Sequence, residues 1–169
     1  MTDPLTIAGN IDEAACLETL AGMVRHKSYS ETPGERVLAE HMVRMMKDLG
    51  FDEAYLMPVE GKRVNAIGVW RGTGGGQSLL FNGHLDTNPA TEGWTVDPWG
   101  GVIDEDFIYG IGVSNMKAGD AAYLCAVRTL IEQGVRLKGD VILTFVIGEL
   151  QGGVGTHAAV KAGLRADYF

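Results

Sequence analysis

The 169-residue sequence has little of what membrane, disulfide-rich and secreted proteins need. It has two cysteines, Cys16 and Cys125, which lie in helix-like patterns among apolar neighbours without the short spacing of metal ligands, so we expect reduced thiols in the core. No apolar run approaches the roughly 18 residues that span a bilayer. The first ten residues have no basic stretch followed by an apolar run, as a secretory signal would. We therefore expect a cytoplasmic protein with no membrane partner.

Positive charge is also scarce. The sequence has 14 Lys and Arg residues against 22 Asp and Glu residues, and its formal net charge is -8. Because such a charge repels phosphate backbones and anionic lipids, we exclude nucleic acid as a partner. The composition, with 46% hydrophobic and 21% charged residues, is typical of a globular domain with a packed core.

The hydrophobic pattern changes period along the chain and predicts an α/β fold. The helix signals include a capping box at Asn10 and Glu13, and the segment Thr32-Pro33-Gly34-Glu35. An order of strand, crossover helix and strand favours parallel pairing. We therefore predict a mostly parallel mixed sheet with helices on both faces. The expected helices cover residues 10–26, 33–49, 117–133 and 155–162, and the expected strands cover 51–59, 64–71, 78–84, 103–109 and 141–147.

Two segments do not fit a regular element. The loop over residues 85–102 is rich in Gly, Pro, Asp and Trp, and loops of this length in compact domains are often functional. Trp94 and Trp99 within it either pack the loop or line the rim of a cleft. The chain ends on Tyr168-Phe169, an aromatic pair that resembles the start of an interrupted strand. We therefore expect a truncated chain.

Three side chains could carry chemistry. His84 and Asp86 stand where strand 78–84 enters the long loop. They form either a capped strand end with a turn aspartate or a metal-binding imidazole oriented by a carboxylate. Glu149 follows the buried strand 141–147, at the edge where open α/β sheets place their ligands. It is either a solvated loop residue or part of the same site.

A nucleotide site is the weaker interpretation of the glycines at 110 and 112. Gly110-Ile111-Gly112 precedes a helix, but position 115 is Asn where the third glycine of the dinucleotide fingerprint would stand. No Gly-Lys-Ser/Thr segment follows. We therefore disfavour bound nucleotide.

Four motifs in order carry a resemblance to a known family. They are FNGHLDT (81–87), GWTVDPW (93–99), YGIGVSNMKAG (109–119) and GELQGG (148–153). They resemble the zinc-dependent metallohydrolases that include acetylornithine deacetylase, succinyl-diaminopimelate desuccinylase, aminoacylase and glutamate carboxypeptidase. The resemblance covers nearly the whole chain. It implies that residues 1–169 are the N-terminal part of the catalytic domain, without the family's lid or dimerisation domain and its C-terminal catalytic segment.

The resemblance also implies roles for individual residues. His84 matches a zinc ligand, and Asp86 matches the carboxylate that steadies it. Glu149 matches the first residue of a Glu-Glu pair, the general base that takes a proton from the attacking water. A cis peptide bond is implied between Asn115 and Met116.

The sequence departs from the family at two ligand positions. Asn115 stands where the family has an aspartate that bridges two metals, and Leu150 stands where the second glutamate binds one metal. Because the site loses two negative charges and one ligand, we predict that the paired-metal site is not formed. We expect zinc, or cobalt or manganese, as fewer than two ions, with His84 and Asn115 as the metal-binding residues of this chain.

These inferences define one expected function and one alternative. The expected function is a metal-dependent hydrolase that cleaves amide bonds of N-acyl amino acids or small peptides, with Asp86 and Glu149 as the catalytic residues. The alternative is a non-catalytic relative that keeps the fold and a ligand cleft, because of Asn115 and Leu150. The expected partners are the small-molecule substrate and a second copy of the protein, joined through the absent domain.

Overall fold

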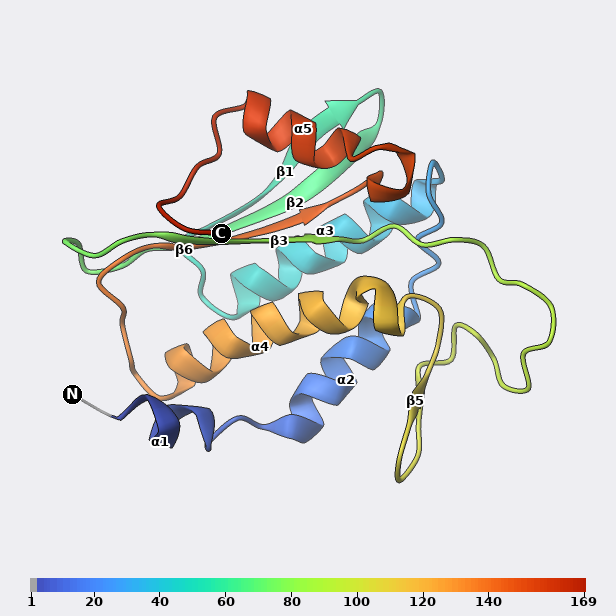
Figure 1. The fold of residues 1–169 in the computed structure, drawn as a ribbon, viewed down its shortest axis with the longest axis horizontal. Helices are drawn as coiled ribbons and strands as arrows, with labels where there is room; N and C mark the ends of the chain where they lie inside the picture. Colours follow the sequence, from blue (N-terminus) through green and yellow to red (C-terminus); the bar gives the residue numbers. More distant parts are fainter. Residues whose placement is uncertain (1–2) are drawn as a thin grey trace.

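The computed structural model describes residues 3–169 and contains a four-stranded mixed sheet between two helical layers (Figure 1). The strand order is β1-β2-β6-β3. A separate two-stranded hairpin, β4 with β5, extends from the helical side in Figure 1. The elements are α1 (Pro4–Ala8), α2 (Glu13–Val24), α3 (Pro33–Asp48), β1 (Glu53–Glu60), β2 (Arg63–Trp70), β3 (Leu79–His84), β4 (Val102–Ile103), β5 (Ile108–Tyr109), α4 (Ala118–Glu132), β6 (Val141–Val146) and α5 (Val154–Lys161).

The predicted class, a mixed α/β sheet with helices on both faces, is confirmed. The parallel pairing is less extensive than expected. Strands β3 and β6 are parallel, whereas β2 pairs antiparallel with both β1 and β6. The pairing of β1 with β2 is antiparallel because a tight turn at residues 61–62 connects them and reverses the chain. The crossover through α4 gives the one parallel pair.

The main core lies between the sheet and helices α2, α3 and α4. Its fully buried side chains include Trp70, Leu143 and Phe145. A smaller apolar cluster of Met57, Ile67 and Ala159 joins the opposite face of the sheet to α5. Burial on both faces accounts for the near-continuous apolar run of β6.

Two sequence predictions need correction, and one helix was not predicted. The single strand expected over 103–109 is the hairpin of β4 and β5, because Asp104 accepts hydrogen bonds from the backbone of Asp106 and Phe107 and closes a turn. The first long helix begins at Glu13 rather than near Asn10, since Asp12 caps it by accepting from the backbone of Ala15. The short helix α1 was not predicted; Asp3 caps it. Among residues 3–169, no helix is long and apolar enough to cross a membrane.

Candidate active site

Two strands end side by side at the candidate site. In the parallel pair, His84 at the end of β3 lies opposite Val146 at the end of β6. The backbone N–H of Leu85 donates to the carbonyl of Val146 at 2.8 Å, so the pairing extends to the sheet edge. Beyond it, β3 leads to Asp86 and β6 leads to the turn that begins at Glu149. The structure thus brings the two segments to one edge.

The buried carboxylate of Asp86 joins three segments at this edge. Its Oδ1 accepts from the backbone N–H of Glu149 at 3.1 Å, and its Oδ2 accepts from that of Leu150 at 3.2 Å. The hydroxyl of Ser30 donates to Oδ2 at 2.6 Å. Burial raises the pKa of Asp86, but these hydrogen bonds and the one from His84 outweigh burial and hold the pKa well below its usual range. Asp86 is therefore a carboxylate at neutral pH that fixes the turn carrying Glu149.

The imidazole of His84 has a partner at each nitrogen. Nδ1 donates to the backbone carbonyl of Asp86 at 3.0 Å and lies 3.5 Å from Asp86 Oδ1. Nε2 faces Asn115 Oδ1 at 3.1 Å and Glu149 Oε2 at 3.8 Å. Burial lowers the pKa of His84, but hydrogen bonds to Asp86 and Asn115 and the charge of Asp86 raise it to about 9. When the ring is protonated at Nε2, that N–H donates to the Asn115 carbonyl oxygen.

Asn115 reaches the site from a turn that precedes α4. The turn follows Gly112, whose backbone is left-handed (φ 84°), and it includes a cis peptide bond between Asn115 and Met116, as the sequence resemblance implies. Lys117 anchors the turn. Its buried Nζ donates at 3.0 Å to the carbonyls of Met23 and His26, at the C-terminal end of α2. Asn115 is thus held in place by a contact with a helix far away in the sequence.

A second buried carboxyl, Asp120, lies close to the site in the first turn of α4. It is fully buried, and neither of its oxygens has a hydrogen-bond partner among the described residues. A methyl group at Gly83 would lie 1.8 Å from Asp120 Oδ1, so the absence of a side chain at Gly83 makes room for this carboxyl. Burial raises the pKa of Asp120 well above its usual value, although the charges of His84 and Lys117 oppose this.

The turn at Glu149 lies against a partly buried ion pair. Arg63 on β2 makes two hydrogen bonds of 2.8 Å to the carboxylate of Glu35, and Glu35 is fully buried. A methyl group at Gly148 would come within 2.8 Å of the Arg63 guanidinium, so the guanidinium lies against the residue before Glu149. Glu149 itself has a side chain that is 52% exposed. Its carboxylate is therefore accessible, while the backbone beneath it is fixed.

An open cleft of about 460 Å³ adjoins Asn115. Trp94 lines it together with Tyr109 and Ser114. Trp99, in contrast, is buried and packs edge-on against Tyr29 with ring centroids 4.9 Å apart. Of the two tryptophans in the long loop, Trp94 thus lies at the rim and Trp99 packs the loop.

Sequence reasoning did not select Ser30, Lys117 or Asp120. The sequence pattern could have indicated Asp120, because it lies on the apolar face of α4 with Leu124 and Val127 and a carboxyl there would be buried. Ser30 lies in a loop without periodicity and contacts Asp86 across 56 residues, so no local pattern points to it.

The ring nitrogen Nε2 of His84 and the amide oxygen of Asn115 could bind one divalent cation in place of the proton between them. Nδ1 of His84 donates to the Asp86 carbonyl, so in the neutral ring Nε2 has a free lone pair. That lone pair and one on Asn115 Oδ1 face each other. Two such donor atoms can bind either a shared proton or one divalent cation. The Glu149 carboxylate faces the same point, whereas Leu150 has no donor atom in its side chain. Within residues 3–169, no group of three or more His, Cys, Asp or Glu side chains is arranged to hold a metal ion.

Comparison with solved structures defines the class. The fold matches an M20 family metallo-carboxypeptidase from Sulfolobus solfataricus with a TM-score of 0.79 and 25% identity, over 92% of this chain and 36% of that one. The architecture is therefore that of an M20 metallopeptidase domain.

The sequence comparison gives the family. The chain belongs to the Peptidase family M20/M25/M40, whose model matches residues 80–169. It is 38% identical over 108 residues to the N-formyl-4-amino-5-aminomethyl-2-methylpyrimidine deformylase of Bacillus subtilis (strain 168), covering 62% of this chain and 25% of that enzyme. It is 35% identical over 124 residues to the succinyl-diaminopimelate desuccinylase of Gluconobacter oxydans (strain 621H), covering 73% and 32%. The chain thus spans about a quarter to a third of these relatives, and the predicted family resemblance is confirmed.

Proposed function

We propose that this chain supplies part of the active site of a metal-dependent hydrolase that cleaves amide bonds of N-acyl amino acids or small peptides. In this proposal it is the N-terminal part of the catalytic domain. The convergence of Asn115 Oδ1 and the Glu149 carboxylate on Nε2 of His84 carries the proposal. The names of the two curated relatives, which describe removal of a formyl and a succinyl group, support the reaction class.

In this proposal each residue of the site has a separate role. A zinc, cobalt or manganese ion held by His84 and Asn115 would act as a Lewis acid that polarises the amide carbonyl. Asp86 orients the imidazole through its backbone carbonyl and keeps the turn of Glu149 in position. Glu149, exposed and 3.8 Å from Nε2, accepts a proton from the attacking water and returns it to the leaving amine nitrogen. The cleft beside Asn115 accommodates the substrate, with Trp94 at its rim.

The activity test uses the purified full-length protein, of which this proposal makes the chain the N-terminal part, with added Zn²⁺, Co²⁺ or Mn²⁺ and a panel of N-formyl, N-acetyl and N-succinyl amino acids and dipeptides. We expect hydrolysis of at least one substrate. Glu149→Gln should lower the rate by about 10²- to 10⁴-fold, the contribution of a general base, with metal binding retained. Glu132→Gln, an exposed carboxylate at the end of α4, is the matched control and should leave the rate unchanged. No hydrolysis of any substrate by protein that binds metal would reject the catalytic proposal.

The alternative is a non-catalytic relative that keeps the fold and the cleft. The residues that favour it are Asn115 and Leu150, which replace a carboxylate by an amide and by an alkyl group. For either function we propose one bound ion, since a second has too few donors here. Restoring both carboxylates with Asn115→Asp and Leu150→Glu should raise the metal content from one ion to two per chain. An unchanged content would mean that the register of these positions is wrong. A homodimer through a further domain and a cytoplasmic location stay predictions.

A further inference from the structure

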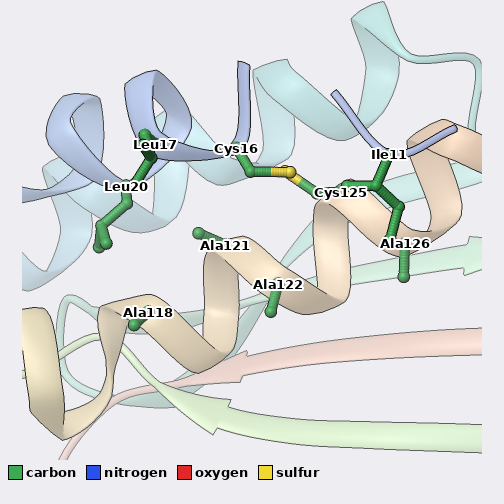
Figure 2. Close-up of a pocket in the computed structure, with 9 residues that line it drawn as sticks. All are labelled: Ile11, Cys16, Leu17, Leu20, Ala118, Ala121, Ala122, Cys125 and Ala126. Atoms are coloured by element: carbon green, nitrogen blue, oxygen red, sulfur yellow. The ribbon is translucent and has the colours of Figure 1, made fainter. Parts of the chain in front are cut away.

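Two thiols from helices far apart in the sequence face each other between α2 and α4. Cys16 is on α2 and Cys125 is on α4, and Figure 2 shows their side chains directed toward each other. Both cysteines are free and both line the same cavity between the two helices. The prediction that both are core thiols holds for Cys125, which is buried, but Cys16 is only partly buried.

The surroundings of the pair are apolar and open on one side. The thiols line a cavity of about 260 Å³ between α2 and α4. Small side chains on α4 let the two helices approach closely. The remaining lining residues are Ile11, Leu17, Leu20, Ala118, Ala121, Ala122 and Ala126. A molecule as small as a peroxide can therefore reach the sulfur of Cys16, while the helices hold Cys125 in place.

The two thiols differ in their environment. Burial and the contact with Cys16 raise the pKa of Cys125 to about 12, so this residue remains a thiol at neutral pH. Cys16 is closer to solvent, because its side chain is only partly buried. Cys16 is therefore the sulfur that meets an oxidant first, and Cys125 is placed to react with the product.

We propose that Cys16 and Cys125 form an oxidation site at which a peroxide links α2 to α4 by a disulfide. The thiol of Cys16 attacks one oxygen of the peroxide, the O–O bond breaks, and Cys16 becomes a sulfenic acid while water leaves. The sulfur of Cys125 then attacks the Cys16 sulfur. The S–O bond breaks, and the hydroxyl leaves as water with the Cys125 proton. One peroxide is reduced to two waters, and two thiols are oxidised to one disulfide.

The link would join the two helices that hold the Asn115 turn. Lys117 donates to carbonyls at the end of α2, and α4 begins at the next residue. A bond between Cys16 and Cys125 closes a loop of more than 100 residues, which restricts the unfolded chain strongly. We expect the oxidised protein to melt higher by on the order of 10 °C.

The test treats the reduced, purified protein with hydrogen peroxide and maps its peptides without reductant. The expected result is a Cys16–Cys125 peptide pair that has lost two hydrogen atoms, together with loss of both titratable thiols and a higher melting temperature that dithiothreitol reverses. Cys16→Ser, which changes the less buried member, should prevent the link and the shift. Cys125→Ala, which matches the alanines around it, should leave a sulfenic acid on Cys16 that a dimedone probe captures.

Two results would overturn the proposal, and a third would overturn the stabilisation expected from it. In the first, peroxide oxidises Cys16 to sulfinic acid while Cys125 stays free in the wild-type protein. In the second, only intermolecular disulfides form. In the third, the intramolecular link forms but lowers the melting temperature, which would mean that the native helix packing does not accommodate the bond.

Discussion

Replacing Asp120 by Asn should stabilise the protein, and the gain should grow as the pH rises. Asp120 is fully buried, and its carboxyl oxygens have no hydrogen-bond partner within residues 3–169. Burial raises its pKa in the folded state. A group with a raised folded pKa contributes its full stability below its unfolded pKa, near 3.8, and loses it as the pH rises toward the folded pKa. Asn has the same shape but cannot ionise.

The size of the expected stability gain can be worked out from the cost of burying the carboxyl group and from its proton linkage. An unsatisfied buried polar group costs about 1–3 kcal/mol, and more when charged. One proton changes the free energy of unfolding by at most about 1.4 kcal/mol per pH unit. We therefore expect the free energy of unfolding of Asp120→Asn to match that of the wild type at about pH 4 and to exceed it by about 1–3 kcal/mol at about pH 7.

Urea unfolding of both proteins at several pH values between about pH 4 and pH 8 measures this difference. Glu132→Gln removes an equal charge from an exposed position of the same helix and should change stability by less than about 0.5 kcal/mol at every pH. If Asp120→Asn were less stable than the wild type at neutral pH, the carboxylate would have a compensating partner and the reasoning would be refuted.

Two further substitutions test the support of the site. Arg63→Met leaves the buried carboxylate of Glu35 without its partner, so urea unfolding should show a loss of about 3–5 kcal/mol; a loss below about 1 kcal/mol would contradict the assigned burial of the pair. Ser30→Ala removes the hydroxyl that donates to Asp86, and competition with a chromophoric chelator should show zinc affinity reduced about 10-fold or more, whereas unchanged affinity would show that this contact does not position the site.

The sequence predicts a strand more accurately where the strand is long and apolar than where it is short or where strands distant in the sequence pair. The run over 141–147 corresponds closely to β6, because burial on both faces demands a continuous apolar pattern. The predicted strand 78–84 also corresponds closely to β3, although β3 is an edge strand and is buried only at its carboxyl end. The hairpin of β4 and β5 was missed because its strands are too short to show a period. The antiparallel pairing of β2 with β6 was missed too, since no local signal sets the order of strands in a sheet.

In the candidate site, too, local sequence motifs were predicted and long-range contacts were not. Residues in motifs, such as His84 and Glu149, were predicted, and the structure brings them together with Asp86 and Asn115 at the sheet edge. The residues that hold this group in place were not predicted. Ser30 reaches its partner across 56 residues and Lys117 reaches α2 across more than 90, and only the folded chain brings such groups into contact.

The most direct test of this account counts zinc ions bound by the purified full-length protein, using calorimetric titration at neutral pH, before and after His84→Ala. The ring at position 84 offers a nitrogen toward the amide oxygen of Asn115, so we expect one tightly bound ion for the wild type and none for the variant. His157→Ala, on the exposed side of α5, should bind one ion like the wild type. A wild-type protein that binds no zinc, or a His84→Ala variant that retains it, would contradict the proposal that this sheet edge holds a metal.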